Sequence, residues 1–578
     1  MAALSKAHVE LQSTEEEYDG IDETSKSRNL RGSINPSWYS PQTGIYSSKY
    51  PCINLPSDPF LDVVSFIFSR KHNGLHALVD SASGLSVPYS KLSPLVKSMA
   101  AGLHYHFGVK QGDVILILLP NSVCFPLIFL GALSLGAVVT PMNPLSNMLE
   151  IKKQVLDCNV TLAFAATGKV DELVSALRGC HVVGVPEALG MNSLSSDGSV
   201  FHKLISSDPA MAPMPRIAQQ DTAAILYSSG TTGRSKGVML SHGNFIAMIE
   251  LFVRFEASLY DYPSSENVYL AVVPMFHVYG LSLFVLGLLS LGSTVVTMKR
   301  FDADEMVRAI DRYAVTHLHS VPPILVALTK RAKRGGGASF RSLKQVSCGA
   351  APLSKKSITE LIEALPHVDF IQGYGMTEST ALATRGYNTV GAHKYLSVGV
   401  LSPNVEAKVV DWVSGAHLPP GSVGELWLRT PGNMKGYLNN IDATMVALDK
   451  DGWLHTGDIV YFDQEGYLYV IDRLKEVIKY KGFQIAPADL EAVLMSHSEV
   501  LDAAVTGYRD EEAGEIPVAF VVRREGSYLS ETALMSYVAK QVAPYKKVRK
   551  VYFSSSIPRS PAGKILRREL RNLLVSRL

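Results

Sequence analysis

The stretch "LYSSGTTGRSKGVMLSH", residues 226–242, has the composition of a loop that binds phosphate groups. Its glycines let the backbone turn N–H groups toward an anion, its hydroxyl side chains add donors, and Lys236 adds a positive charge. It matches neither of two familiar phosphate motifs. Gly237 follows Lys236 where a Walker loop needs serine or threonine, and Thr232 stands where a dinucleotide-binding turn needs glycine. A mobile surface loop has a similar composition, so both interpretations stay open on this segment alone.

Outward from this loop, strand-like and helical runs alternate. "TAAIL" before it is apolar and strand-like, and "HGNFIAMIELF" after it can form a helix. From about residue 60 to 470, runs such as "DVILILLP", "TLAFAA" and "STVVTM" alternate with amphipathic stretches, which predicts α/β layers with parallel sheets. Short β segments separated by turns take over around residues 400–470, and a new α/β pattern begins after Arg473.

The chain has 578 residues, more than a single hydrophobic core usually holds. We expect three parts. Residues 1–35 are charged and contain no apolar run of the signal-peptide kind, so they form a disordered or loosely attached tail. Residues 36–471 form a large N-terminal domain, and residues 472–578 form a small C-terminal domain joined through residues 472–475.

The composition is that of an ordinary globular protein, with 47% hydrophobic and 19% charged residues. A net charge of +2 gives no reason to expect a nucleic-acid partner or a charged membrane surface. The five cysteines are far apart and form no C-x-x-C pair. This spacing argues against zinc and against a disulfide framework, and it fits a reducing setting.

Two apolar runs raise the question of a membrane: "FPLIFLGALSLGAVVTPM" (residues 125–142) and "GLSLFVLGLLSLGSTVVTM" (residues 280–298). Each contains glycine and serine and changes to β-branched residues near its end. We therefore expect a buried helix followed by a strand in both cases, and no transmembrane segment.

Four further segments carry side chains suited to chemistry. They are "VPMFHVYGLS" (residues 273–282), "QGYGMTES" (residues 372–379), "GWLHTGDIVYFDQEGYLYVIDRLKEVIKYKGFQIAP" (residues 452–487) and "PRSPAGKILRREL" (residues 558–570). Each has an ordinary explanation when taken alone. Glu378 can be a solvated turn residue, Lys564 a surface lysine, and His277 a hydrogen-bonded core histidine.

Together, in this order, the segments resemble the motifs of the adenylate-forming superfamily, which includes acyl-CoA synthetases, luciferases and adenylation domains. The resemblance runs from about residue 60 to the end of the sequence. It is strongest to plant 4-coumarate–CoA ligases and ligase-like proteins, through "GYGMTE", "GWLHTGDI", "DRLKEVIKYKGFQIAPADLE" and "DEEAGEIPVAFVV". It implies a large N-terminal domain of stacked α/β subdomains with a β-rich part, and a small mobile α+β C-terminal domain.

The resemblance also implies a two-step reaction. A carboxylate attacks the α-phosphorus of ATP and expels pyrophosphate, and the thiol of coenzyme A then displaces AMP from the acyl-adenylate. Both steps concentrate negative charge, so catalysis depends on positioning and electrostatic stabilisation. ATP, Mg²⁺, coenzyme A and a carboxylic acid are the small molecules expected.

By the same resemblance, the loop and Lys236 hold the β- and γ-phosphates, Tyr374 lies near the adenine, and Asp458 accepts hydrogen bonds from the ribose. Glu378 helps to hold Mg²⁺, a hard cation that prefers oxygen ligands. The residues expected to bind ATP or AMP are Ser228, Ser229, Gly230, Thr231, Thr232, Lys236, Gln372, Gly373, Tyr374, Thr377, Asp458, Arg473, Lys475 and Lys564.

The C-terminal domain is expected to rotate about Lys475 between the two steps. Lys564 then leaves the active site, and another face of the domain enters it. The residues assigned to catalysis are Lys564, Lys479, Gln484, Thr377 and His277, and those assigned to coenzyme A are Arg300, Lys481 and Gly482.

The acyl pocket is assigned to His277, Tyr279, Gly349, Ala381 and Leu382. His277 and Tyr279 match the hydroxycinnamate ligases. After Glu378, however, those enzymes have Ala-Gly-Pro-Val where this chain has "STAL". A phenylpropanoid acid of the 4-coumarate type is therefore expected, with a medium- or long-chain fatty acid or a jasmonate precursor as the alternative. A luciferase-like oxygenase and a non-enzymatic binding module are more remote alternatives.

The sequence closes with Ser576, Arg577 and Leu578, which resembles a Ser-Lys-Leu peroxisomal address. The expected partner is the peroxisomal import receptor, and the cytoplasm is the alternative location. An amphipathic terminal helix that happens to stop there is the other interpretation of the same residues.

Overall fold

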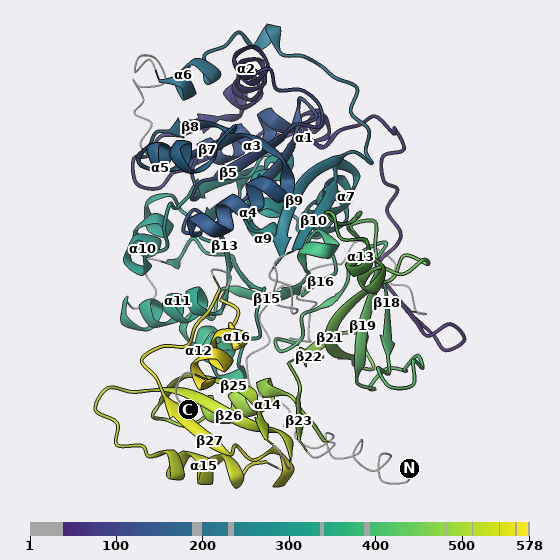
Figure 1. Ribbon diagram of the computed structural model, residues 1–578, viewed down its shortest axis with the longest axis vertical. Coiled ribbons are helices and arrows are strands. Elements are labelled where there is room, and N and C mark those ends of the chain that lie inside the picture. The colour runs from purple at the N-terminus through teal and green to yellow at the C-terminus, as the bar shows by residue number, and fades with distance from the viewer. Residues whose placement is uncertain are drawn as a thin grey trace.

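The structure is a computed structural model, and it describes residues 38–187, 199–228, 236–335, 340–386, 394–474, 476–480, 483–510, 513–542, 544–560 and 563–575. The tail predicted for residues 1–35 lies outside these ranges. Figure 1 shows two α/β sheets with their helices, a β-rich part beside them, and the C-terminal part below.

The first α/β sheet has seven strands and carries the hairpin that flanks the glycine-rich loop. Its order is β20 (Gly436–Tyr437), β10 (Lys236–Ser241), β9 (Thr222–Ser228), β6 (Val138–Pro141), β5 (Val114–Leu118), β7 (Val160–Ala166) and β8 (His181–Val185). The pairs from β9 to β8 are parallel, and β10 runs antiparallel to β9. Along the chain, α2 (Tyr89–Phe107) precedes β5, α3 (Cys124–Leu133) and α4 (Met148–Cys158) connect the strands from β5 to β7, and α7 (His242–Met248) follows β10.

The second α/β sheet has nine strands. Its order is β17 (Val400–Leu401), β16 (Thr384–Arg385), β15 (Asp369–Tyr374), β14 (Gln345–Cys348), β13 (His317–Ser320), β11 (Val268–Ala271), β12 (Thr294–Thr297), β3 (His76–Asp80) and β4 (Ser86–Pro88). The strands from β15 to β3 pair in parallel. Helices α10 (Ala303–Arg312), α11 (Pro322–Gly335) and α12 (Lys355–Ala364) follow β12, β13 and β14 along the chain. The predicted α/β layers with parallel sheets are confirmed.

The two apolar runs form buried helices that lead into strands, as predicted. α3 is buried along its whole length and precedes β6, and α9 (Val278–Gly280) with the π-helical segment Leu281–Gly287 precedes β12. No described helix combines the length and apolar character that a membrane span needs.

The β-rich part is a six-stranded sheet of antiparallel neighbours. Its order is β1 (Tyr39–Ser40), β2 (Ile45–Ser47), β18 (Glu406–Val410), β19 (Gly424–Arg429), β21 (Leu454–Phe462) and β22 (Leu468–Arg473). The last strand leads directly to the C-terminal part, so this sheet connects the nucleotide motifs with the mobile domain that the sequence predicts.

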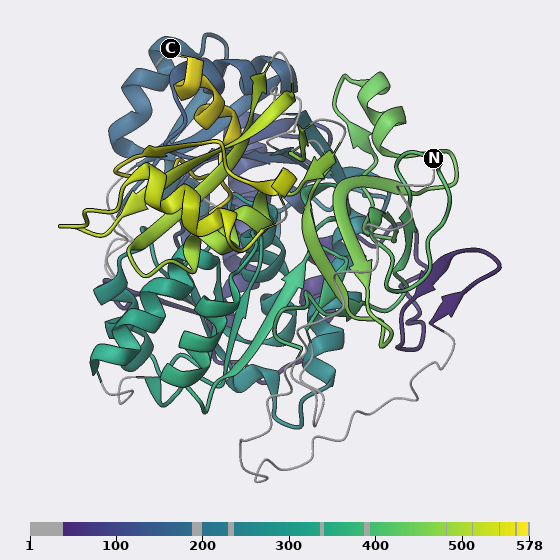
Figure 2. The same cartoon turned by 90° about the horizontal axis from the view of Figure 1, so that it is seen from below.

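The C-terminal part is an α+β unit with hydrophobic clusters of its own, including Ile478, Leu490, Val505 and Val521. Its sheet contains β24 (Phe483–Ile485), β23 (Ile478–Tyr480), β26 (Gly514–Arg523), β25 (Val500–Asp510) and β27 (Lys550–Phe553). Helices α14 (Pro487–Met495), α15 (Glu531–Ala539) and α16 (Arg567–Val575) pack on it. Figure 2 shows this unit in front of the large part when the molecule is seen from below.

Candidate active site

A cavity of about 640 Å³ lies where the large α/β sheets, the β-rich sheet and the C-terminal part meet. Its wall brings together residues that are far apart in the sequence. The residues of the wall that were predicted to bind a substrate or take part in catalysis are Ser228, Lys236, His277, Tyr279, Gly349, Gly373, Tyr374, Thr377, Glu378, Ala381, Arg473 and Lys564.

Behind the wall at one end of this cavity, the buried carboxylate of Asp458, which does not itself line the cavity, is held by two residues of the wall. The hydroxyl of Tyr374, at the end of β15, donates a hydrogen bond of 2.5 Å to Oδ2 of Asp458. Arg473 Nε lies 3.0 Å from the other carboxylate oxygen, Oδ1, because the β21–β22 register sets Asp458 opposite Arg473. Burial and the Asp458 carboxylate raise the pKa of Tyr374, so its hydroxyl stays a donor. The arrangement gives a preorganised hydrogen-bond acceptor suited to a sugar hydroxyl.

A second carboxylate, Glu378, lies in the short helical turn Thr377–Ser379 and is 7% exposed. Ser228 Oγ and the hydroxyl of Tyr437 each donate a hydrogen bond of 3.0 Å to its Oε1. Lys236 begins β10 opposite Ser228, and its Nζ lies 4.6 Å from the centre of the Tyr437 ring. Lys236 and the Glu378 carboxylate therefore both lie where β9 ends and β10 begins, beside the glycine-rich loop that joins these strands. Ser229, Gly230, Thr231 and Thr232 lie outside the described residues.

The turn that carries Glu378 is tight. Thr380 and Ala381 have φ angles of +54° and +61°, a left-handed conformation that costs free energy for residues other than glycine. A hydrogen bond of 2.6 Å from Thr380 Oγ1 to the carbonyl of Gly432 supports it. Gly375 permits it, because a Cβ atom there would lie 2.5 Å from the carbonyl oxygen of Ala381. Backbone packing thus fixes the direction of the Glu378 side chain.

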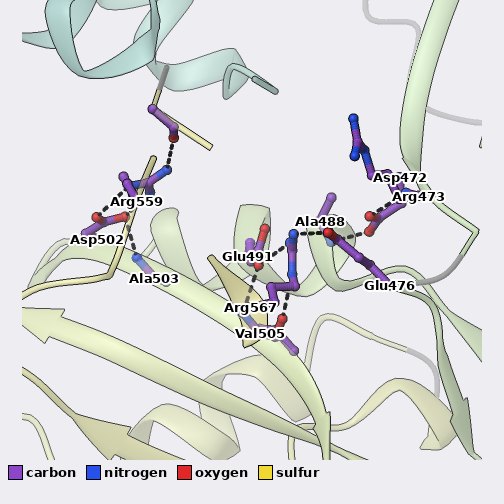
Figure 3. Close-up of polar contacts among 11 residues, drawn as sticks. Asp472, Arg473, Glu476, Ala488, Glu491, Asp502, Ala503, Val505, Arg559 and Arg567 are labelled. Atoms are coloured by element: carbon purple, nitrogen blue, oxygen red, sulfur yellow. Dashed lines mark hydrogen bonds and ion pairs between the residues drawn. The ribbon is translucent and has the colours of Figure 1, made fainter. Parts of the chain in front are cut away.

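Lys564 reaches the cavity from the C-terminal part on a loop that is held in place. Arg559 Nη1 donates to the carbonyl of Gly563 (2.9 Å), and Nη2 of the same guanidinium lies 2.7 Å from Asp502 Oδ1. Figure 3 shows this pair beside the strand that carries Asp502. The backbone N–H of Lys564 donates to Ser560 Oγ at 3.2 Å. These contacts tie Gly563 and Lys564 to Arg559 and Ser560, so Arg559 is a positioning residue for Lys564.

The charge on Lys564 depends on pH. Burial and, to a smaller extent, the Arg473 guanidinium lower the pKa of Lys564 to about 8, against the opposing effect of the Glu476 and Asp458 carboxylates. Its ammonium group is therefore protonated at neutral pH, and it loses the proton within the mildly alkaline range.

Polar contacts also hold the C-terminal part against the end of β22. Asp472 Oδ2 accepts a hydrogen bond of 2.9 Å from the backbone N–H of Ala488, and Arg567 pairs with both Glu476 and Glu491. Figure 3 shows this cluster around Arg567. These residues surround position 475, the predicted hinge. Lys475 itself lies outside the described residues.

Other predicted residues are not brought into the cavity wall. Gln372 Nε2 donates to the carbonyl of Tyr395 at 2.6 Å, and Arg300 is exposed in the turn after β12. The backbones of Lys479 and Gln484 lie in β23 and β24, but their side chains lie outside the description, as do Lys481 and Gly482.

The other end of the cavity is formed by the predicted acyl residues. Nδ1 of His277 accepts a hydrogen bond of 3.3 Å from the backbone N–H of Tyr279, and burial lowers the pKa of His277 to about 4, so the imidazole is neutral. The Tyr279 hydroxyl lies 3.5 Å from Nδ1 of His319. Ala381 lines the cavity, whereas Leu382 is fully buried and packs toward Gly432. Of these two residues, only Ala381 contributes to the wall.

Sequence patterns missed several residues of the site. Tyr437, which binds Glu378, and Ser347 and Arg385 at the acyl end all line the cavity. Glu256 and His319 lie behind the wall, where Glu256 pairs with Arg385. The signal present in the sequence is Arg385, a charged residue that closes the otherwise uncharged run "STALATR".

Comparison with known protein families assigns the whole arrangement. The family described as AMP-binding enzyme matches residues 68–438, and the AMP-binding enzyme C-terminal domain matches residues 489–564. The chain belongs to the AMP-binding enzyme family. It is an AMP-forming acid–thiol ligase of the acyl-CoA synthetase kind, a family whose substrates are ATP, coenzyme A and an acid. This agrees with the predicted ligase and not with the oxygenase or binding-module alternatives.

Relatives of this ligase come from plants and bacteria. It is 59% identical to 4-coumarate–CoA ligase-like 6 of Arabidopsis thaliana, over 94% of this chain and 95% of that protein. It is 44% identical to peroxisomal OPC-8:0-CoA ligase 1 of Arabidopsis thaliana, over 92% and 96%. The crystal structure of ATP-bound MatB from Rhodopseudomonas palustris superposes with a TM-score of 0.80 at 25% identity, covering 89% of this chain and 98% of that one.

Proposed function

We propose that this ligase joins a phenylpropanoid acid of the 4-coumarate type to coenzyme A through an acyl-adenylate. The observation that carries the proposal is that one cavity has Lys564 and Arg473 in the same wall as Glu378 and the aromatic side chain of Tyr279. One end thus offers groups for a nucleotide, and the other offers an aromatic surface for an acyl group.

In the first step, an oxygen of the carboxylate attacks the α-phosphorus of ATP. The bond from that phosphorus to the bridging oxygen breaks, and pyrophosphate leaves. The ammonium group of Lys564 lies between the two reactants and offsets the charge that develops there, a role suited to a point charge on a long stem. Asp458 holds the ribose, Tyr374 and Gly373 lie beside the base with Gln372 behind them, and Thr377 contacts the α-phosphate. Lys236 and the serine- and threonine-rich loop after Ser228 hold the departing phosphates.

Glu378 suits Mg²⁺. Both hydrogen bonds to its carboxylate reach Oε1, which leaves Oε2 as a hard oxygen ligand. Among the described residues, no group of three or more metal-binding side chains surrounds it. A magnesium ion here would take its other ligands from phosphate and water, and it would neutralise charge on the leaving group.

In the second step, the thiol of coenzyme A attacks the acyl carbon and AMP leaves. We propose that residues 472–578 rotate about Lys475, so that Lys564 withdraws and Lys479, Lys481, Gly482 and Gln484 approach the adenylate, with Arg300 near coenzyme A. The hydrogen bond from the backbone N–H of Ala488 to Asp472, which spans position 475, would have to rearrange in that rotation. The neutral imidazole of His277 can orient the acyl group without adding a charge.

A jasmonate-precursor acid is the second candidate substrate. The 44% identical relative is named for OPC-8:0, and the backbone at Ala381 cannot accept the proline that hydroxycinnamate ligases carry there, since its φ of +61° is closed to proline.

An acid panel tests the proposal. Purified protein is incubated with ATP, Mg²⁺, coenzyme A and one acid at a time, and AMP and the acyl-CoA are measured. The 4-coumarate-type acids are expected to give the highest kcat/KM. A higher value for the jasmonate precursor selects the second candidate, and no acyl-CoA from any acid contradicts ligase function.

We also propose a peroxisomal location, through recognition of Ser576, Arg577 and Leu578 by the peroxisomal import receptor. The peroxisomal relative supports it. A fluorescent protein that carries the last twelve residues is expected to enter peroxisomes, and the same fusion without Leu578 is expected to stay diffuse. A diffuse signal from the intact tail would favour the cytoplasm.

A further inference from the structure

A buried ion pair stands at the acyl end of the cavity. Arg385 lies in β16 opposite Gly373 of β15, and its side chain forms part of the cavity wall although it is only 3% exposed. Its Nε lies 2.5 Å from Oε2 of Glu256, whose side chain is 12% exposed. An arginine is rarely buried this deeply unless it is paired, and here one carboxylate compensates its charge.

The guanidinium keeps hydrogen-bonding capacity beyond this pair. Nη2 donates to Oε1 of Gln345 at the long distance of 3.5 Å, and Nε, although it pairs with Glu256, has no hydrogen-bond partner of good geometry among the described residues. A guanidinium has five N–H donors, and leaving a charged donor unmatched in a buried wall is costly. An oxygen atom of a ligand can satisfy these donors.

The surroundings of Arg385 are polar on one side and apolar on the other. Ser347 and Tyr279 line the same cavity, and the Tyr279 hydroxyl lies 3.5 Å from His319. Burial and, secondarily, Arg385 lower the pKa of His319, so that imidazole adds no charge. The ring of Phe252 lies 5.1 Å from the Arg385 guanidinium carbon and also lines the cavity. An apolar wall that ends in fixed donors fits a carbon skeleton that ends in an oxygen.

The charge balance around Arg385 decides which kind of substrate oxygen can bind there. Because Glu256 already neutralises Arg385, a second carboxylate on the substrate would bring an uncompensated negative charge into a buried site. A neutral acceptor, such as a ketone, hydroxyl or phenol oxygen, gains a charge-assisted hydrogen bond without that cost.

We propose that Arg385, held by Glu256, forms a subsite that selects acids carrying a neutral oxygen at the end away from the reacting carboxylate. This inference rests on the proposed ligase function and narrows it. It separates oxygenated acids, whether phenolic or aliphatic, from plain fatty acids and from dicarboxylic acids.

Matched acids test the subsite. The kcat/KM of the full chain is measured for 4-coumarate against cinnamate. It is also measured for an aliphatic keto acid against the fatty acid and the dicarboxylic acid of equal length. We expect each oxygenated acid to exceed its plain counterpart by about tenfold to a hundredfold, because a site built to donate a hydrogen bond rejects an analogue that lacks the acceptor. The dicarboxylic acid should be the poorest of its set.

The variant Arg385→Met with Glu256→Gln removes both charges together and avoids an unpaired buried ion. We expect the oxygenated and plain acids to become equivalent within about twofold. The matched control, Arg429→Met with Glu406→Gln, removes another arginine–glutamate pair that is not part of the cavity wall and should keep the wild-type preference. If the double variant does not fold, Arg385→Lys keeps the charge with fewer donors and should reduce the preference severalfold.

The outcomes separate this inference from the ligase proposal. The subsite is overturned if the wild-type protein ligates oxygenated and plain acids with equal kcat/KM. It is also overturned if the preference for oxygenated acids survives in the folded double variant. Both results leave the ligase function standing. A preferred dicarboxylic acid overturns the subsite as well. Absence of acyl-CoA from every acid overturns the ligase function, and the subsite with it.

Discussion

The two ends of the cavity are built in different ways. At the nucleotide end, Tyr374, Asp458 and Arg473 form one continuous chain of polar contacts, and each belongs to a short, recognisable motif. At the acyl end, Arg385 and Glu256 come from segments with no such motif and meet only in the folded chain. If the proposed roles hold, the comparison teaches that one end of the cavity fixes the activation chemistry and the other end decides the choice of acid.

The largest effect is expected for Lys564→Ala. It removes the positive charge that the proposed mechanism puts between the carboxylate and the α-phosphate, so acid-dependent pyrophosphate exchange should fall by about a hundredfold to a thousandfold. Thioester formation from preformed acyl-adenylate should largely survive, because the second step does not use this side chain. The exposed Lys540→Ala serves as the control. Equal loss of both half-reactions would refute the exchange of faces about position 475.

Asp458→Asn is expected to act on the nucleotide end alone. It keeps the shape of the side chain but removes the negative charge that pairs with Arg473 and that, in the proposed mechanism, accepts hydrogen bonds from the ribose, so the KM for ATP should rise by about tenfold to a hundredfold. The ratio of kcat/KM values between two acids should not change. A changed acid ratio in this variant would show that the two ends are coupled.

Raising the pH should have a smaller effect, through Lys564. Its pKa is lowered to about 8, so above that pH the side chain is neutral and stabilises less charge. We expect kcat/KM for pyrophosphate exchange to fall about tenfold for each pH unit above about 8. Lys564→Arg, which stays protonated, should be slower but lack this alkaline decline. A decline that persists in Lys564→Arg would assign the pKa to another group.

Tyr279→Phe should have the smallest effect and act on the acyl end. The change keeps the ring but removes the hydroxyl near His319. The KM for the acid should rise by about threefold to tenfold, since a single hydrogen bond contributes about 1 kcal/mol. The KM for ATP, measured in the same experiments, should stay the same. An equal rise in both would contradict the separation of the ends.

The same contrast explains how far the sequence could predict the molecule. Strands such as β5 and β7 are buried parallel strands, and continuous apolar runs announce them. Glu378 and Lys564 stood out because glycine-rich turns surround them. The order of these motifs gave the fold class and the ligase chemistry, both of which the structure and the comparisons confirm.

The acyl end could not be predicted in the same way. Arg385 follows a short uncharged run and contacts Glu256, which is 129 positions earlier in the chain. Leu382 was expected to line the pocket from its place after Glu378. The left-handed backbone at Thr380 and Ala381 turns the chain so that only Ala381 reaches the wall. Pocket shape depends on such backbone turns and long-range pairs, which no local pattern carries.

The most direct test of the account is acid-dependent exchange of labelled pyrophosphate into ATP, measured without coenzyme A for a series of acids. Exchange should require an acid, and its kcat/KM should vary by more than about a hundredfold between acids while the KM for ATP stays within about twofold. Exchange that does not need an acid, or a KM for ATP that changes in step with acid preference, would contradict a cavity with one end for activation and another for selection.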